Sequence, residues 1–264
     1  MTSLAAIKNA WEDLAEQDAM GAILTDPSKV GGRWDLREFM QTGEAEVETV
    51  LGHLTRIGEI PDFGGTALDF GCGVGRLTQA LASRFASCVG VDISTLMIRN
   101  AVTLNQHEHC AYQLVTGNVL PFADGTFSFI YSNIVLQHVP RKYAIGYLRE
   151  FERVLKPGGI LVFGVQDCFA APDFASKMIR MRHVLRLRSR LRAALGRSGD
   201  MQMHLFPERL VHRALSGCRV VDVQVTNTAA KDFNGRLRYL DEAPTLGYVG
   251  KQYCVVNEGA TRKR

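Results

Sequence analysis

Leu68-Asp69-Phe70-Gly71-Cys72-Gly73-Val74-Gly75-Arg76 is the stretch that decides the fold. Its three glycines stand at alternate positions between a short apolar strand, expected over 66–70, and a helix, expected over 74–85. Glycine lets the backbone turn sharply and approach a ligand closely because it has no Cβ. The first turn of the helix presents free N–H groups to the same ligand. A strand, a glycine-rich turn and a helix in this order predict a nucleotide-binding unit.

The spacing of the glycines narrows the choice of nucleotide. A dinucleotide site has the pattern G-x-G-x-x-G, and its third glycine would fall at position 76, which is Arg76. Asp69 stands two residues before the first glycine, where a carboxylate suits an ammonium group and would repel a pyrophosphate. Asp92 ends the next strand, where a carboxylate can accept hydrogen bonds from two ribose hydroxyls. The two acids therefore indicate one nucleoside that carries an amino group.

Strands and helices alternate on both sides of this turn. This alternation predicts a parallel sheet with helices on both faces. The expected strands are 66–70, 88–91, 112–115, 127–131, 160–165, 219–226 and 248–256. The expected helices are 4–20 and 44–57 before the first strand, and 74–85, 94–105, 141–155 and 207–216 after it.

Composition limits the class of protein. The chain has 264 residues, of which 46% are hydrophobic and 22% are charged, so it is long enough for one ordinary α/β domain with additions. No run of apolar residues is long enough to cross a membrane, and the N-terminus turns acidic too early for a secretory signal. The six cysteines are scattered without a CxxC pair, which is typical of reduced thiols. We therefore expect a cytoplasmic protein.

The positive charge is concentrated in one segment. The formal net charge is +4, but the stretch from Phe174 to Gly199 has eight cations and no acid, so the remainder carries about −4. The cations are Lys177, Arg180, Arg182, Arg186, Arg188, Arg190, Arg192 and Arg197. Three interpretations of the segment 177–197 are open. It forms a solvated helix whose arginine stems cover the sheet, a patch that binds an anionic acceptor or a lipid headgroup, or a nucleic-acid site. Nucleic acid ranks last because interleaved aromatic residues for base stacking are missing.

Four motifs resemble those of the class I S-adenosylmethionine-dependent methyltransferases. They are Leu68 to Gly75, Val91-Asp92, Leu120-Pro121-Phe122 and Leu155-Lys156-Pro157-Gly158-Gly159. The similarity is closest to the small-molecule branch typified by the ubiquinone and menaquinone methyltransferases (methyltransferase type 11), and it covers residues 65–166 well. It implies a seven-stranded Rossmann-like sheet in the order 3-2-1-4-5-7-6 with strand 7 antiparallel, an N-terminal helical lid and a helical insertion before strand 6.

The resemblance also implies S-adenosyl-L-methionine as the cofactor and S-adenosyl-L-homocysteine as the product. Asp69 and the backbone of the glycine turn would hold the methionyl part, and Asp92 the ribose. Asn118 stands where the family often has an acid that contacts the adenine amino group, and its amide can still form hydrogen bonds. The expected cofactor contacts are Asp69, Gly71, Cys72, Gly73, Gly75, Arg76, Asp92, Ile93, Met97, Asn118, Val119, Asn133 and Gln137, with Ile93 and Met97 beside the adenine.

The methyl acceptor would bind beyond the carboxyl end of the fourth strand. That strand runs into Tyr131-Ser132-Asn133-Ile134-Val135-Leu136-Gln137-His138-Val139-Pro140, which lacks the Pro-Pro-aromatic, Pro-Cys and acidic patterns of several other methyltransferase chemistries. His138 is the candidate general base because imidazole titrates near neutral pH. The alternative reading is that His138 opens the next helix and only packs or caps it.

Three residues outside these motifs are candidates for substrate contacts: Trp34, Phe39 and His204. Trp34 and Phe39 belong to the lid-like N-terminal segment, where aromatic rings can interact with a sulfonium charge. Packing between helices is the alternative for both, and a solvated helix face is the alternative for His204. The run His107-x-His109-Cys110 has metal-ligand residue types but is too short to form a site alone, so no metal is expected.

Taken together, these features predict an enzyme that methylates a hydroxyl of a small molecule, a natural product or carbohydrate, by an SN2 reaction with His138 as base. C- or N-methylation of a quinone or amine stays open, as does a non-catalytic cofactor-binding protein whose basic helix binds RNA or a membrane. We expect a lid at 1–61, a cofactor-binding domain at 62–258 with an insertion capping the acceptor site at 167–215, and a tail at 259–264. The expected partner is a small-molecule acceptor, with an anionic acceptor and a homodimer left open.

Overall fold

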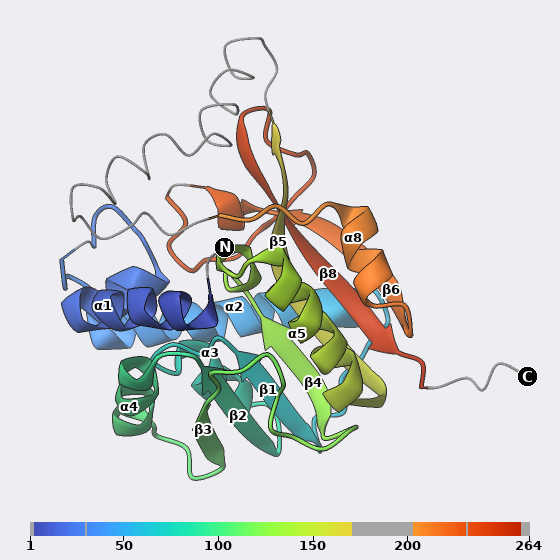
Figure 1. Ribbon diagram of the computed structural model, residues 1–264, viewed down its shortest axis with the longest axis horizontal. Helices are drawn as coiled ribbons and strands as arrows, with labels where there is room; N and C mark the ends of the chain where they lie inside the picture. The colour runs from blue at the N-terminus through green and yellow to red at the C-terminus, as the bar shows by residue number, and fades with distance from the viewer. Residues whose placement is uncertain (1–2, 30, 171–202, 231, 260–264) are drawn as a thin grey trace, which may run out of the picture.

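Eight strands form one sheet in the order β3-β2-β1-β4-β5-β8-β6-β7, with helices on both faces (Figure 1). The computed structural model describes residues 3–29, 31–170, 203–230 and 232–259. The strands are β1 (Thr66–Phe70), β2 (Ser87–Asp92), β3 (Cys110–Leu114), β4 (Phe127–Ser132), β5 (Leu155–Ala170), β6 (Cys218–Thr226), β7 (Tyr239–Leu240) and β8 (Gly247–Asn257). The helices are α1 (Leu4–Ile23), α2 (Leu36–Arg56), α3 (Arg76–Ala82), α4 (Thr95–Leu104), α5 (Arg141–Val154) and α8 (Glu208–Ala214), with 3₁₀ turns η1 (Leu136–His138) and η2 (Asn227–Ala229).

The topology confirms the predicted fold. Strands β1 to β5 pair in parallel, and β8 lies antiparallel between β5 and β6, as expected of the last strand. The sequence did not predict β7, a two-residue strand that pairs with the end of β6 at the sheet edge. Apart from this added edge strand, the observed order corresponds to the predicted order 3-2-1-4-5-7-6.

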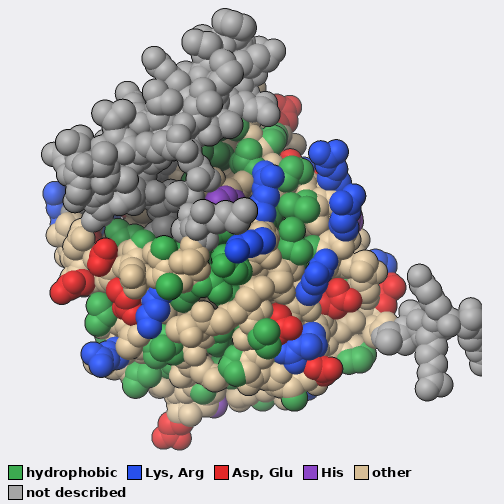
Figure 2. Space-filling model, in the orientation of Figure 1, with side chains coloured by type: hydrophobic (Ala, Val, Ile, Leu, Met, Phe, Trp, Pro, Cys, Tyr) green, Lys and Arg blue, Asp and Glu red, His purple; other side chains and the backbone are tan. Residues whose placement is uncertain are grey.

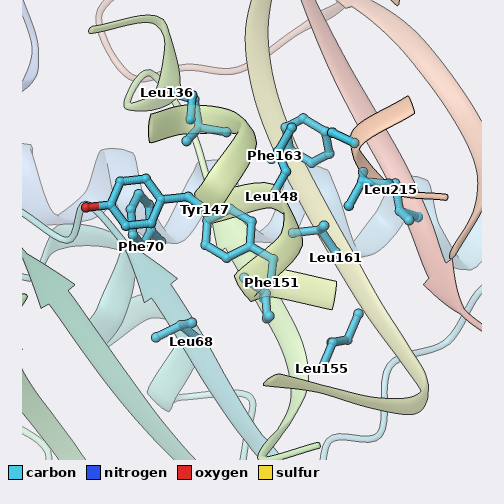
Figure 3. Packing of buried hydrophobic residues seen from close by; sticks show 14 of the residues in the cluster. Leu68, Phe70, Leu136, Tyr147, Leu148, Phe151, Leu155, Leu161, Phe163 and Leu215 are labelled. Atoms are coloured by element: carbon cyan, nitrogen blue, oxygen red, sulfur yellow. The ribbon is translucent and has the colours of Figure 1, made fainter. Parts of the chain in front are cut away.

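Helices α5 and α8 cover one face of the sheet. Their apolar side chains meet those of β1, β4 and β5 in the largest buried cluster of the described chain. Figure 3 shows how the side chains of α5 turn toward the strands; the labelled residues are Leu68, Phe70, Leu136, Tyr147, Leu148, Phe151, Leu155, Leu161, Phe163 and Leu215. Because β4 is buried along its whole length, it is the centre of the sheet and fixes the position of the loop that follows it.

Helices α2 and α3 cover the opposite face, and α1 packs at the carboxyl ends of the strands. Val47, Val50 and Leu54 of α2 contact the sheet together with Leu77 and Leu81 of α3. A third buried cluster joins α1 to α4 and to the loop before α2; it contains Ala15, Leu24, Trp34, Phe39, Val74, Met97 and Phe233. The N-terminal segment is therefore built onto the mouth of the sheet.

Two elements differ in extent from the prediction. Helix α2 begins at Leu36, capped by the Asp35 carboxylate, rather than at residue 44. Gly43 precedes the predicted start of the helix but lies inside α2, where a Cβ would collide with the backbone carbonyl of Arg76. Strand β5 is longer than 160–165 because it pairs with β8 as far as Ala170. The extension of β5 arises from pairing between distant parts of the chain, whereas the start of α2 is set locally by the Asp35 cap.

Part of the predicted insertion, 167–215, and the basic segment 177–197 lie outside the described residues. Within the described ranges, no helix is long and apolar enough to span a membrane. On the face drawn in Figure 2, Lys and Arg side chains lie over α5 and α8. Arg141, Lys142, Arg209 and Arg213 are exposed residues of these two helices. Positive charge is thus present on the outer surface of the described fold.

Candidate active site

A cavity of about 650 Å³ lies at the carboxyl ends of β1, β2, β4 and β5. Phe70, Val91, Asn133 and Gln166 line it from these four strands, and α1 supplies a further wall. A cavity of this size is within the range that holds small molecules and cofactors. The carboxyl edge of a parallel sheet is also where such folds bind ligands.

The glycine loop enters this cavity through Gly71, Cys72 and Gly73. Gly71 and Gly73 have φ values of 81° and 53°, in the left-handed region that favours glycine. A Cβ at Gly71 would collide with Val135, and one at Gly73 would lie 2.5 Å from Ile23 Cδ1. The loop is held in place by the Gly71 and Cys72 amides, which donate to the Val91 carbonyl. The sequence therefore needs glycine here for both backbone conformation and space.

Asp92 lies opposite the loop at the end of β2. Its Oδ2 accepts a hydrogen bond from the Gly73 amide at 2.9 Å, and its Oδ1 accepts one from the Ser94 amide at 2.8 Å. Burial raises the pKa of Asp92, and these amide hydrogen bonds oppose that rise. Asp92, Ile93 and Met97 all line the cavity. A carboxylate held in this way retains lone pairs for a ligand.

Asp69 lies beneath the glycine loop, 1% exposed, and is not part of the cavity wall. Its Oδ2 accepts a hydrogen bond from Thr78 Oγ1 at 2.7 Å. Burial raises the pKa of Asp69 to about 7, although Thr78 and the charge of Arg76 lower it in part. The predicted contact between Asp69 and a ligand ammonium stays a prediction.

A buried polar network supports the floor of the cavity. Arg76 Nη2 donates to Glu46 Oε2 at 2.8 Å, and Arg76 Nη1 donates to Thr42 Oγ1 at 3.2 Å. Glu46 Oε1 also accepts from the Tyr131 hydroxyl at 2.8 Å and from Asn133 Nδ2 at 2.7 Å. Two buried atoms of this network, Arg76 Nε and Asn133 Oδ1, have no hydrogen-bond partner in the described structure. Both residues line the cavity, so a polar ligand can satisfy these atoms.

The segment after β4 turns sharply into the cavity. Ile134 has φ 61°, an uncommon conformation for a β-branched residue that occurs mainly where surrounding contacts enforce it. The η1 turn that follows carries Gln137 and His138, and both line the cavity. The His138 ring lies edge-on to Trp11 of α1, with 5.8 Å between ring centroids. His138 is thus positioned between the sheet and the N-terminal helix.

Several predicted site residues lie away from the cavity wall. Trp34 and Phe39 are buried against each other, and Trp34 Nε1 donates to the Leu24 carbonyl. Both therefore occupy packing positions and are not brought to the cavity. His204 is also outside the wall, although its amide donates to the Gln137 carbonyl.

Three more of the predicted cofactor contacts, Gly75, Asn118 and Val119, do not line the cavity. Gly75 caps α3 next to Tyr112 and does not line the cavity. Asn118 lies against Gly146 of α5, and Val119 is 69% exposed. The predicted contacts of Asn118 and Val119 with adenine therefore stay predictions.

Several residues of the site were missed from the sequence. Helix α1 lines the cavity with Leu4, Ile7, Trp11 and Leu14. The sequence does contain a signal that would have identified Glu46. It is the one acid on the buried face of α2, and a buried carboxylate requires a buried partner. No comparable signal marks α1, whose role depends on where the helix docks.

The described residues contain no cluster of three or more His, Cys, Asp or Glu side chains that could hold a metal. His107 and His109 contact each other edge-on, with 5.5 Å between ring centroids. His109 Nε2 is hydrogen-bonded to the Ala82 carbonyl at 2.8 Å. This run therefore has structural contacts in the described fold.

Comparison with known proteins identifies a methyltransferase domain over residues 68–163. A 2-methyl-6-phytyl-1,4-hydroquinone methyltransferase from Synechocystis sp. is 35% identical over 162 residues, which are 60% of this chain and 50% of that protein. A demethylmenaquinone methyltransferase from Tropheryma whipplei is 34% identical over 126 residues, covering 46% of this chain and 50% of that protein. The chain spans about half the length of these curated relatives.

Solved structures show the same fold over nearly the whole chain. A magnesium protoporphyrin IX methyltransferase from Synechocystis, solved with bound S-adenosylhomocysteine, matches 96% of this chain and 99% of its own with a TM-score of 0.60 at 14% identity. At that identity the likeness concerns the fold alone. The domain match and the sequence relatives go further: residues 68–163 match a methyltransferase domain, and over the matched regions the chain is similar to quinone methyltransferases.

Proposed function

We propose that this chain binds S-adenosylmethionine in the cavity and transfers the methyl group to a hydroxyl of a neutral, largely apolar small molecule. The observation that carries this proposal is that the glycine loop, Asp92 and His138 all line one cavity. These features come from three different strand ends, and the proposed chemistry requires all of them. Both the activity of the chain and the class of its methyl acceptor belong to this proposal.

The polar groups of the cavity fit the cofactor. Arg76 Nε is a buried donor without a partner and would meet the methionyl carboxylate. Asn133 Oδ1 is a buried acceptor without a partner and would meet the ammonium. The Asp92 carboxylate would accept the ribose hydroxyls, and Ile93 and Met97 would flank the adenine. Each proposed contact pairs a donor with an acceptor.

The chain's own residues would position the acceptor and accept its proton. When bound, S-adenosylmethionine supplies an electrophilic methyl carbon, and its sulfur keeps the bonding electron pair as the methyl leaves. His138 would take the proton of the acceptor hydroxyl, so that the oxygen carries no positive charge after methylation. The cavity walls would exclude water and align the reacting oxygen, which supplies much of the rate in such reactions.

The walls of the cavity favour a neutral acceptor. Apolar residues from several elements surround the space; they include Ile7, Trp11, Val139, Ala229 and Phe233. Among the described residues that line it, Arg76 is the only Lys or Arg, and its charge is already paired with Glu46. Among the described residues of the wall, an anionic acceptor would therefore meet no unpaired Lys or Arg. We therefore favour an aromatic hydroxyl compound over a carbohydrate, within the small-molecule class predicted from the sequence.

Calorimetric titration with S-adenosylmethionine and S-adenosylhomocysteine tests the cofactor site. We expect micromolar binding by the wild type and a loss of at least tenfold in Asp92→Ala. Asp124→Ala removes an exposed carboxylate far from the cavity and is the matched control, for which unchanged affinity is expected. Absence of binding by the wild type would contradict the proposal.

Methylation of a ring carbon is the second candidate, favoured by the hydroquinone and demethylmenaquinone methyltransferases among the relatives. Turnover with ¹³C-methyl-labelled cofactor and 2-methyl-1,4-hydroquinone separates the two. A methyl ether in the product spectrum supports O-methylation. A methyl group bonded to the ring supports the second candidate.

A further inference from the structure

Gln166 of β5 is a buried polar residue whose side-chain oxygen is not satisfied within the described fold. It is 1% exposed, and its Oε1 has no hydrogen-bond partner in the described structure. It also lines the cavity, from the strand next to the one that leads to His138. A buried amide without a partner destabilises a protein by about 1–3 kcal/mol, so its retention calls for an explanation.

The backbone of Gln166 is held from both sides. It pairs with Gly250 of β8, and its carbonyl accepts a hydrogen bond from the Phe206 amide at 2.7 Å. The β5–β8 register shifts immediately afterwards, between Gln166 and Cys168. A bulge of this kind redirects side chains and is frequent next to active sites. The side chain is therefore presented to the cavity by a rigid part of the sheet.

The carboxamides of Asn133, just after β4, and Gln166, on β5, differ in their hydrogen bonds. Asn133 Nδ2 is bound to Glu46, and its oxygen lies over Gly164, where a Cβ would collide with it. Gln166 is two residues further along the same face of β5, about 7 Å beyond Gly164. The proposed cofactor contacts account for Asn133. They do not account for Gln166, which lies further toward the end of the strand.

We infer that Gln166 binds the methyl acceptor, through a hydrogen bond between its carboxamide and a hydroxyl on an otherwise apolar ring. This inference rests on the proposed function and names a residue that selects the acceptor. A hydroxyl both donates and accepts, so it can pair with either end of the carboxamide. A methyl ether in the same position would leave the buried Oε1 without a donor, and the site would discriminate against it.

Two probes with the same methyl-substituted ring test this role with S-adenosylhomocysteine bound. 2-Methyl-1,4-hydroquinone carries two hydroxyls, and 1,4-dimethoxy-2-methylbenzene carries none. In anaerobic calorimetric titrations we expect the wild type to bind the hydroquinone about tenfold more tightly, the effect of one net hydrogen bond. Gln166→Met, which keeps the length of the side chain, should bind the two probes equally and bind S-adenosylhomocysteine within twofold of the wild type.

Gln79→Met is the matched control. Gln79 is a buried carboxamide outside the cavity wall, with Nε2 bonded to the Leu104 carbonyl and Oε1 to the Gln106 amide. We expect a lower melting temperature for Gln79→Met and an unchanged preference between the probes. Gln166→Met should melt no lower than the wild type, because it removes a polar group that the fold leaves unsatisfied.

Three outcomes would overturn the inference. One is an unchanged preference for the hydroquinone in Gln166→Met, and another is a wild type that binds both probes equally or binds neither. Both can occur while S-adenosylhomocysteine still binds, and then the proposed function stands without this role. A wild type that fails to bind S-adenosylhomocysteine would overturn the proposed function and this inference together.

Discussion

Glu12 of α1 caps the first turn of α4, with its Oε2 accepting a hydrogen bond from Ser94 Oγ at 2.8 Å. The same carboxylate accepts from the amides of Thr95 at 2.7 Å and Leu96 at 3.0 Å. Glu12 and Ser94 are 82 positions apart in the chain. Ser94 follows Asp92 by two residues, so the contact ties the N-terminal helix to the proposed ribose site.

Replacing Glu12 by Gln should loosen α1 and weaken cofactor binding. The amide keeps one acceptor but loses the charge that favours a helix N-terminus, so we expect a loss of about 1 kcal/mol in unfolding free energy. Cofactor affinity should fall about fivefold, measured by calorimetry with S-adenosylhomocysteine. Glu16→Gln on the same helix is the control. Equal effects of the two substitutions would contradict a specific role for Glu12.

The stability of the protein should depend on Asp69 between about pH 4 and pH 7. Burial raises the pKa of Asp69 from its ordinary value of 3.8 to about 7 in the folded state. In this interval the folded chain retains a proton that the unfolded chain has lost, so the unfolding free energy falls as the pH rises. Asp69→Asn cannot titrate, and its stability relative to the wild type should increase up to pH 7 and then level off.

Urea denaturation of both proteins at pH 5, 6, 7 and 8 measures this dependence. The Asn side chain can still accept the hydrogen bond from Thr78, which isolates the effect of the charge. Asp124→Asn, at an exposed position, should follow the wild type at every pH. Parallel curves for Asp69→Asn and the wild type would show that the carboxylate does not carry the raised pKa.

Breaking the buried ion pair between Glu46 and Arg76 should cost far more than removing a surface charge. Both side chains are nearly inaccessible, and their atoms lie 2.8 Å apart. Glu46→Gln leaves the Arg76 charge buried without compensation, for which we expect a loss of about 3 kcal/mol in unfolding free energy. Glu48→Gln, on the exposed side of α2, should change stability by less than about 0.5 kcal/mol. Thermal and urea unfolding distinguish the two.

His138→Gln tests the proposed base directly. Loss of a general base reduces turnover by about 10²–10⁴-fold. The affinity for S-adenosylhomocysteine should stay within twofold of the wild type, because His138 is assigned to the acceptor side of the cavity. Single-turnover rates with saturating cofactor separate the chemical step from binding. Turnover equal to that of the wild type would contradict the role of His138 as general base.

Local patterns were sufficient to predict the sheet and the placement of the glycine loop beside Asp92. The strand, glycine turn and helix from Leu68 to Arg76 are determined by neighbouring residues, so their form is readable from sequence. The same holds for Asp92, which directly follows an apolar strand. These features depend on spacing within a few residues, and the structure brings Gly71, Gly73 and Asp92 to one cavity as predicted.

Features that depend on distant contacts could not be predicted in this way. Gly43 lies before the predicted helix 44–57, but it is inside α2, where the close approach to Arg76 requires a glycine. Trp34 and Phe39 have the residue types of a binding pocket, yet they pack in the interior in one buried cluster with Met97 and Phe233. The bulge after Gln166 arises from the pairing of β5 with β8. In each case the deciding partner lies far away in the chain.

The docked position of α1 has a consequence for the order of events in each catalytic cycle. The helix lines the cavity above the glycine loop and is fastened to α4 by Glu12. Under the proposed function, we expect spent cofactor to exchange for fresh cofactor when this helix detaches. If detachment is slower than methyl transfer, it sets the steady-state rate, as in other enzymes with closing segments. Its kinetic signature is a burst of product equal to one turnover per enzyme molecule, followed by a slower phase that is sensitive to solvent viscosity.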